Sequence, residues 1–151
     1  TFATRPYPGG LTYSGHPLAC ASAVATINAM REERIVENAA EIGEKVLGPG
    51  LRELAERHPS IGEVRGLGVF WALDLVKNRE TREPLVPYNA SGADNKPMAD
   101  LAAACKERGL WPFTNMNRLH VVPPCTITEE EAKEGLALLD EALAVADAHC
   151  C

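Results

Sequence analysis

The chain has no apolar run long enough to span a bilayer and no excess of basic residues. Its 151 residues include 15 Lys and Arg against 21 Asp and Glu, which gives a formal net charge of −6. A membrane-spanning helix needs about 20 consecutive apolar residues, and proteins bind nucleic acids and anionic membranes through basic patches. The sequence therefore argues against nucleic acid and membrane as partners.

Cysteines at metal-binding or disulfide-framework spacing are also lacking. The five cysteines are Cys20, Cys105, Cys125, Cys150 and Cys151. Their number is odd and no C-x-x-C pair occurs, whereas disulfide frameworks use even numbers and zinc sites use close pairs. We expect no metal site and, because free thiols persist in a reducing compartment, a cytoplasmic protein.

What the sequence does contain is the pattern of an α+β domain, without internal repeats. Helical periodicity predicts helices over residues 18–31, 34–58, 98–108 and 128–149. Strand patterns predict a hairpin or one long bent strand over 61–76, a short strand and turn over 110–113, and a strand over 118–122. Gly48-Pro49-Gly50 predicts a kink or break in the second helix, and Thr128 with Glu131 predicts a capping box. We expect three to four helices packed on a small, mostly antiparallel sheet.

A glycine-rich segment with three hydroxyls, Gly9 to Gly15, leads directly into the first helix. Thr12, Tyr13 and Ser14 supply the hydroxyls. Free backbone N–H groups and the positive end of a helix dipole attract phosphate or carboxylate. A plain helix start uses the same residue types, so the segment by itself leaves both interpretations open.

Three segments together resemble the class III pyridoxal-phosphate aminotransferases, in that family's order. Leu11–Ala21 (L-T-Y-S-G-H-P-L-A-C-A) is similar to the T-x-x-G-N/H-P-L-A-C/A-A motif, in the variant of the branch that handles ω-amino acids with pyruvate. Val64–Val69 resembles the V-R-G-x-G-L strand, and Val121–Thr128 resembles the A-P-P-L-x-I-T segment. The resemblance covers essentially the whole chain and corresponds to the C-terminal third of a family member.

The resemblance implies a fold, a reaction and partners. The fold is the small C-terminal domain of a fold-type I pyridoxal-phosphate enzyme, which is α/β overall. Residues 1–17 would be a phosphate-loop segment and linker from the large domain, and residues 18–151 the small domain. The parent enzyme would be a homodimer that transfers an amino group from a small-molecule donor, an ω-amino acid or amine, to pyruvate or a similar keto acid.

The resemblance also implies where the pyridoxal 5'-phosphate (PLP) cofactor would bind. Leu11, Thr12 and Tyr13 match the cofactor-binding positions, where the threonine hydroxyl and neighbouring backbone hold the cofactor phosphate of the partner subunit. The alternative for Thr12 is a helix-entry hydroxyl that bonds locally. The family's Schiff-base lysine lies upstream, and none of the five lysines here has its context. We therefore expect no catalytic residue in this chain and an inactive isolated fragment.

The resemblance implies that the strand before Pro123-Pro124 recognises the substrate. The family arginine that holds the substrate carboxylate matches the position of His120, and Arg118 lies two residues earlier on the same strand face. Arg118 and His120 are both candidates, with a solvated surface charge as the alternative for Arg118. We expect core packing for Trp111 and Phe113, although both would suit an apolar pocket.

Two other functions fit the sequence. One is a non-catalytic α+β binding or regulatory module, because the chain lacks the family's lysine. The other is an aminomutase or racemase of the same superfamily, because the residues that distinguish these reactions lie mostly upstream.

Overall fold

The structure, a computed structural model, describes residues 3–6 and 9–151. Residues 1–2 and 7–8, which belong to the predicted phosphate-loop segment 1–17, lie outside the described residues. The chain divides into two compact units, residues 1–35 and 36–151, and each is described by itself. The predicted domain boundary after residue 17 stays a prediction.

The first unit is dominated by helix α1, Pro17–Glu32, which confirms the helix predicted over 18–31. Pro17 occupies the first helical turn, where its missing N–H costs no hydrogen bond. None of the residues of α1 is buried, and apolar side chains such as Leu18 and Val24 are exposed.

The second helical region differs from the predicted break. Helix α2, Ile35–Ile42, continues into a π-helical turn, η1, Gly43–Leu47, and then into α3, Gly48–Arg57. The N–H of Gly48 bonds to the carbonyl of Gly43, one residue further back than in an α-helix. Pro49 then falls in the first turn of α3, where an N–H has no helical partner in any case. The chain therefore stays helical through the proline.

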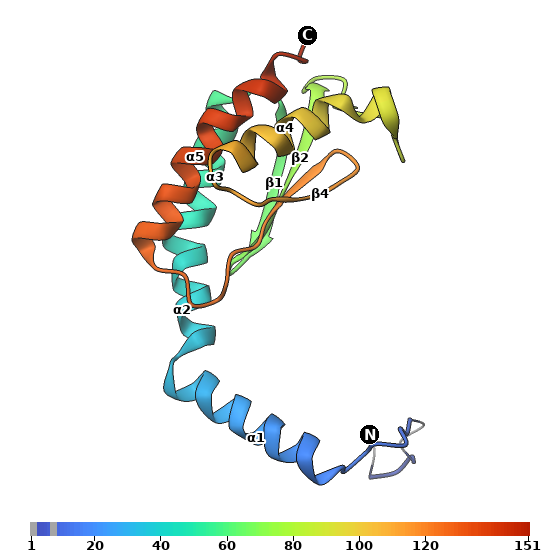
Figure 1. Ribbon diagram of the computed structural model, residues 1–151, viewed down its shortest axis with the longest axis vertical. Coiled ribbons are helices and arrows are strands. Elements are labelled where there is room, and N and C mark those ends of the chain that lie inside the picture. The colour runs from blue at the N-terminus through green and yellow to red at the C-terminus, as the bar shows by residue number, and fades with distance from the viewer. Residues whose placement is uncertain (1–2, 7–8) are drawn as a thin grey trace. The chain divides into compact units, whose positions relative to one another are not determined.

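A small antiparallel sheet forms the second layer of this unit (Figure 1). Its strands are β1, Ile61–Leu67; β2, Phe70–Asn78; β3, Glu83–Pro84; β4, Phe113–Asn115; and β5, Arg118–Val121. The strand order is β1-β2-β5-β4, with β3 added to β2, and every pair is antiparallel. Residues 61–76 thus form the predicted hairpin. The strand expected over 110–113 lies instead at 113–115, because Met116, with φ of 55°, turns the chain there.

Helices cover one face of this sheet and leave the other face to the candidate site. Helix α4, Lys96–Glu107, follows the short 3-10 turn η2, Gly92–Asn95, and packs on α5, Glu129–Asp147. The strand residues that point toward the helices, such as Trp71, Leu73 and Leu119, are buried. The predicted capping box of Thr128 and Glu131 is present, and the fold is α+β as expected.

A histidine cluster joins α3 to α5. His58 is buried, and its Nδ1 and Nε2 lie 2.7 Å from Asp147 Oδ2 and 2.7 Å from Asp140 Oδ1. Ser60 Oγ donates to Asp147 at 2.6 Å, and Arg57 donates to Asp140 at 2.6 Å. Polar groups from the end of α3 and the start of β1 therefore hold α5 in place.

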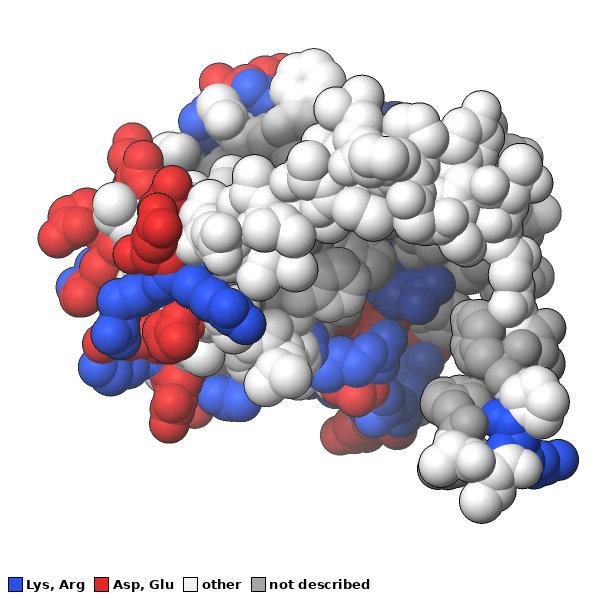
Figure 2. Space-filling model, turned by 90° about the horizontal axis from the view of Figure 1, so that it is seen from below, with Lys and Arg blue, Asp and Glu red and all other residues white. Residues whose placement is uncertain are grey.

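Charges of both signs are mixed on the surface. On the face that Figure 2 shows, Lys and Arg side chains lie next to Asp and Glu side chains, and the described residues form no extended basic area there. Lys133 and Glu129 form one of the exposed ion pairs of the described residues, at 2.5 Å. Among the described residues, no helix combines the length and the apolar character needed to cross a membrane.

Candidate functional site

The predicted cofactor segment forms a tight turn ahead of α1. Ser14 N–H donates to the carbonyl of Leu11 at 2.9 Å, and Leu11 N–H donates to Ser14 Oγ at 3.2 Å. His16 N–H donates to the carbonyl of Tyr13 at 3.1 Å. Gly15, with φ of 75°, closes the turn in a conformation that favours glycine. His16 is the N-cap of α1, and its ring centroid lies 5.7 Å from that of Tyr13.

Thr12 lies at the tip of this turn and is exposed. No group in the described part of the chain bonds to its hydroxyl, and the α1 N-cap receives no side-chain hydrogen bond. The local helix-entry role that was the alternative for Thr12 is therefore absent from the described residues. The hydroxyl and the neighbouring backbone N–H groups are available to an anion such as a phosphate.

Arg118 and His120 lie together on the outer face of β5, as the alternation of strand side chains predicts. In the sheet register His120 stands between Ala72 of β2 and Phe113 of β4. Arg118 stands between Asp74 and Asn115, one pair further along the strand. Two residues along a strand cover about 6.6 Å, so the two candidates occupy adjacent rows of one surface.

His120 is an aromatic neighbour of two phenylalanines. Its ring centroid lies 5.2 Å from that of Phe113 and 6.3 Å from that of Phe70, and both pairs are tilted. Its Nε2 atom is buried without a hydrogen-bond partner among the described residues. Burial lowers the pKa of His120 below its usual value, and the charge of Arg118 lowers it further. His120 is therefore an uncharged ring at neutral pH.

Arg118 differs from the other arginine on this face, Arg65. Arg65 is neutralised by Asp74 at 2.5 Å and by Glu63 at 3.4 Å. Arg118 is half-buried and makes no ion pair with any carboxylate of the described residues. Arg118 is therefore the available cation on the outer face.

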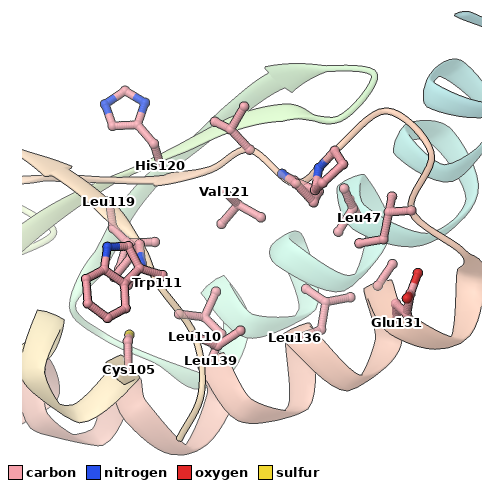
Figure 3. A pocket seen from close by; sticks show the side chains of 17 residues that line it. Leu47, Cys105, Leu110, Trp111, Leu119, His120, Val121, Glu131, Leu136 and Leu139 are labelled. Carbon is pink, nitrogen blue, oxygen red and sulfur yellow. The ribbon is translucent and has the colours of Figure 1, made fainter. Parts of the chain in front are cut away.

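The opposite face of β5 borders an apolar cavity of about 320 Å³. Leu119 and Val121 line it from the strand, and Leu136 and Leu139 line it from α5. In Figure 3 the His120 ring points away from this cavity, on the other side of β5. The cavity therefore lies in the packing between sheet and helices, and His120 is the residue of the outer face that also borders it.

The aromatic residues before β5 do not pack as expected. Trp111 and Phe113 are 84% and 64% exposed, so the expectation of core packing is wrong for both. Trp111 borders the mouth of the cavity and receives Lys106 Nζ at 4.5 Å from its ring. Sequence reasoning also missed Phe70, which is 62% exposed and joins His120 through the pairing of β2 with β5.

The lysines lie at the surface beside partners rather than in a cofactor pocket. Four form ion pairs: Lys45 with Glu41, Lys77 with Glu83, Lys96 with Asp100 and Lys133 with Glu129. The hydrogen bonds that Lys45 and Lys133 donate to Glu41 and Glu129 raise the pKa of both lysines. A Schiff-base lysine needs a lowered amine pKa, and the environments of Lys45 and Lys133 shift the pKa in the opposite direction. Over the described residues, no cluster of His, Cys, Asp and Glu is arranged to hold a metal ion.

Comparison with known proteins gives one family. The family model "Aminotransferase class-III" matches residues 3–143. The chain is 36% identical over 138 residues to ethanolamine-phosphate phospho-lyase homolog 1 of Caenorhabditis elegans, covering 87% of this chain and 27% of that protein. It is 33% identical over 141 residues to 4-aminobutyrate aminotransferase GabT of Escherichia coli, covering 89% of this chain and 30% of that protein.

A solved structure agrees with this family. The taurine:2-oxoglutarate aminotransferase of Bifidobacterium kashiwanohense, in complex with PLP and glutamate, superposes with a TM-score of 0.82 at 36% identity. The match covers 99% of this chain and 33% of that one. The chain thus spans about a third or less of the length of the proteins it matches.

Proposed function

Because the chain belongs to the class III aminotransferases, we propose that it contributes to a PLP enzyme that transfers an amino group from an ω-amino acid or amine to pyruvate or a similar keto acid. The class uses PLP, and the matching taurine:2-oxoglutarate aminotransferase binds it together with glutamate. When bound, PLP serves as the electron sink that makes amino transfer possible. In this proposal the lysine that carries PLP lies outside the 151 residues.

The proposal assigns the phosphate of PLP to Leu11, Thr12 and Tyr13. The observation that supports it is the exposed turn, in which the Thr12 hydroxyl has no partner among the described residues. A hydroxyl and backbone N–H groups suit a phosphate, because charge-assisted hydrogen bonds to it are short and strong. We assign the phosphate to the partner subunit's PLP, which makes the functional enzyme a homodimer. The cytoplasmic location stays a prediction.

The proposal assigns the substrate carboxylate to Arg118, with His120 beside it. The observation that carries this assignment is that Arg118 forms no ion pair among the described residues. The other arginine of the outer face, Arg65, is neutralised by carboxylates. A guanidinium binds a carboxylate through two parallel hydrogen bonds. Burial and the charge of Arg118 lower the pKa of His120, which favours the neutral ring, so the proposal gives the charge neutralisation to Arg118.

The experiment compares two acceptors, one with a carboxylate and one without. In the PLP-bound enzyme, Arg118→Ala should reduce kcat/KM for pyruvate about ten- to a hundredfold more than for an aldehyde. Arg118→Lys should rescue it poorly, because a point charge lacks the planar fork. A selective loss in His120→Ala, with no loss in Arg118→Ala, would move the carboxylate to His120. An enzyme that binds PLP but transfers no amino group to any keto acid would contradict the proposed reaction.

The similarity to a phospho-lyase homolog favours a second candidate, elimination of phosphate from a phosphorylated amine. The two reactions differ in their need for an acceptor. Amino transfer requires a keto acid and produces a new amino acid, whereas elimination releases inorganic phosphate without any acceptor. Measuring the amino acid formed from the keto acid and the inorganic phosphate in one reaction mixture distinguishes the two reactions. An aminomutase or racemase would only isomerise its substrate and would form neither of these two products.

A further inference from the structure

The outer face of the sheet changes from apolar to charged along the strands. The apolar end holds Leu67 and Phe70, which pair with each other where the β1–β2 hairpin closes. The next row holds His120 and Phe113 beside Ala72, with Arg65, which is ion-paired to Asp74, at its β1 end. One further row along β5 stands Arg118, next to Asp74 of β2. The gradient places aromatic rings and a cation about 6.6 Å apart along the strand.

The two phenylalanines of this face are exposed. Phe70 and Phe113 are 62% and 64% exposed, and their ring centroids lie 6.3 Å and 5.2 Å from that of His120. The rings of Phe70, His120 and Phe113 come from three different strands, and the imidazole neighbours both phenyl rings. We call these three rings the aromatic frame. A flat aromatic group of a ligand packs favourably against the edges and faces of such tilted rings. Covering a neutral imidazole with that group costs less free energy than covering a charged one, because no full charge loses its water.

The charged part of the face offers one cation rather than a general basic surface. Asp74 and Glu63 neutralise Arg65, which leaves Arg118 as the group for an anion. Because Arg118 borders the aromatic frame on one side only, a ligand that uses both must carry its negative charge at one end and its apolar group at the other.

We infer that Phe70, His120 and Phe113 determine substrate specificity by selecting molecules with a flat aromatic group, linked by a short chain to an anion that Arg118 binds. The inference rests on the proposed function for the identity of the substrate and extends it to a substrate class, aryl-substituted carboxylates. Phe70 and Phe113 act by contact with the ring, and neither takes part in proton transfer.

The inference is tested by binding to the 151-residue chain, without PLP or turnover. The probes are 3-phenylpropanoate, pentanoate and 3-phenylpropan-1-ol, which separate the ring from the charge. Backbone ¹H–¹⁵N shifts followed by titration give the dissociation constants and the location. We expect 3-phenylpropanoate to bind most tightly and to shift the signals of β5 and of Phe70 and Phe113.

Variants separate the two parts of the site. Phe113→Ala should weaken 3-phenylpropanoate binding about two- to tenfold and leave pentanoate nearly unchanged, since an aromatic pair contributes that much. Phe113→Leu keeps apolar volume without the ring and should lose most of the same preference. Arg118→Gln should weaken both acids and leave the alcohol unchanged. Trp111→Ala is the matched control, because Trp111 is also an exposed aromatic residue but lies against Lys106.

The outcomes are separable from those of the proposed function. Equal affinity for phenyl and alkyl acids, equal effects of Phe113→Ala and Trp111→Ala, or shifts confined to residues away from β5 would each overturn the inference. Absence of amino transfer in the PLP-bound enzyme would overturn the proposed function and leave this binding preference intact. Both phenylalanines are exposed, so these substitutions do not remove core packing, and circular dichroism checks that the variants remain folded.

Discussion

Thr12 is the residue on which the cofactor assignment depends most directly. Its hydroxyl lies in an exposed turn without a partner among the described residues. In the PLP-bound enzyme, Thr12→Ala should raise the dissociation constant of PLP about ten- to a hundredfold, because losing a hydrogen bond to a charged group costs about 1.5–3 kcal/mol. Thr12→Ser keeps the hydroxyl and should retain most of the affinity. An unchanged affinity in the alanine variant would remove Thr12 from the phosphate site.

Asp140 gives the His58 cluster a measurable pH dependence. The hydrogen bond from His58, with help from Arg57, lowers the pKa of Asp140. A carboxyl with a lowered folded pKa contributes stability above its unfolded pKa of about 3.9, and this contribution is lost as the pH falls through the folded value. Asp140→Asn should therefore cost about 1 kcal/mol of unfolding free energy at pH 7, since the side chain is partly exposed.

Urea unfolding at several pH values tests the sign of this effect. The difference between Asp140→Asn and the unmodified chain should shrink as the pH falls below about 3, where the carboxyl is protonated in both states. Asp94 is a matched control, because it is exposed and makes no ion pair with any described residue. Asp94→Asn should change stability by less than about 0.5 kcal/mol. A difference for Asp140 that grows in acid would contradict the proposed sign.

At the scale of elements, the π-helical turn depends on close backbone approach to the β1–β2 turn. A Cβ atom on Gly43 would lie 2.0 Å from the carbonyl oxygen of Gly68. Gly43→Ala should lower the unfolding free energy by about 3 kcal/mol or more, because backbone has to move. Gly135 in α5 is the counterpart: its Cβ would meet only Leu110, at 4.0 Å. Gly135→Ala should raise the unfolding free energy by about 0.5–1 kcal/mol. Urea unfolding measures both variants, and a change of the unfolding free energy in the same direction for both would contradict this contrast.

Most helices and strands were predictable from the sequence, because each has one buried face and therefore a clear period; α1, which buries no residue, was predictable from its Ala-rich composition after Pro17. The π-helical turn was not, since Pro49 indicates a perturbed helix but not how the hydrogen bonds rearrange around it. Phe113 was misjudged for a related reason. An apolar residue in a strand pattern is typical of a core position, and only the tertiary structure tells which face of the sheet the helices cover.

The candidate site was predictable to the same extent. Arg118 and His120 lie on one strand, so a period of two already places them on one face. Phe70 is 50 residues away in sequence and reaches His120 through the β2–β5 pairing, which no local pattern specifies. The pairing of Arg65 with Asp74, which leaves Arg118 as the available cation, is likewise set by strand register.

At the scale of the whole molecule, three ordered motifs identified the family even though the chain spans about a third or less of the matched proteins. The three motifs lie within this chain, whereas the proposed function places the lysine that carries PLP outside it. In the proposed function Thr12 and Arg118 bind anions, whereas the environments of Lys45 and Lys133 raise the amine pKa rather than lower it. Binding and covalent chemistry are therefore assigned to different parts of the enzyme, and this division is testable on the chain itself.

The test is covalent labelling with PLP followed by borohydride reduction, digestion and mass spectrometry. An amine must be uncharged to attack the PLP aldehyde, and carboxylates raise the pKa of Lys45 and Lys133. Lys106 is held over the Trp111 ring. We expect weak labelling spread over several lysines, with the same distribution for pyridoxal, which lacks the phosphate. Stoichiometric labelling of one lysine that required the phosphate would contradict this prediction, because it would place a complete cofactor site within these 151 residues.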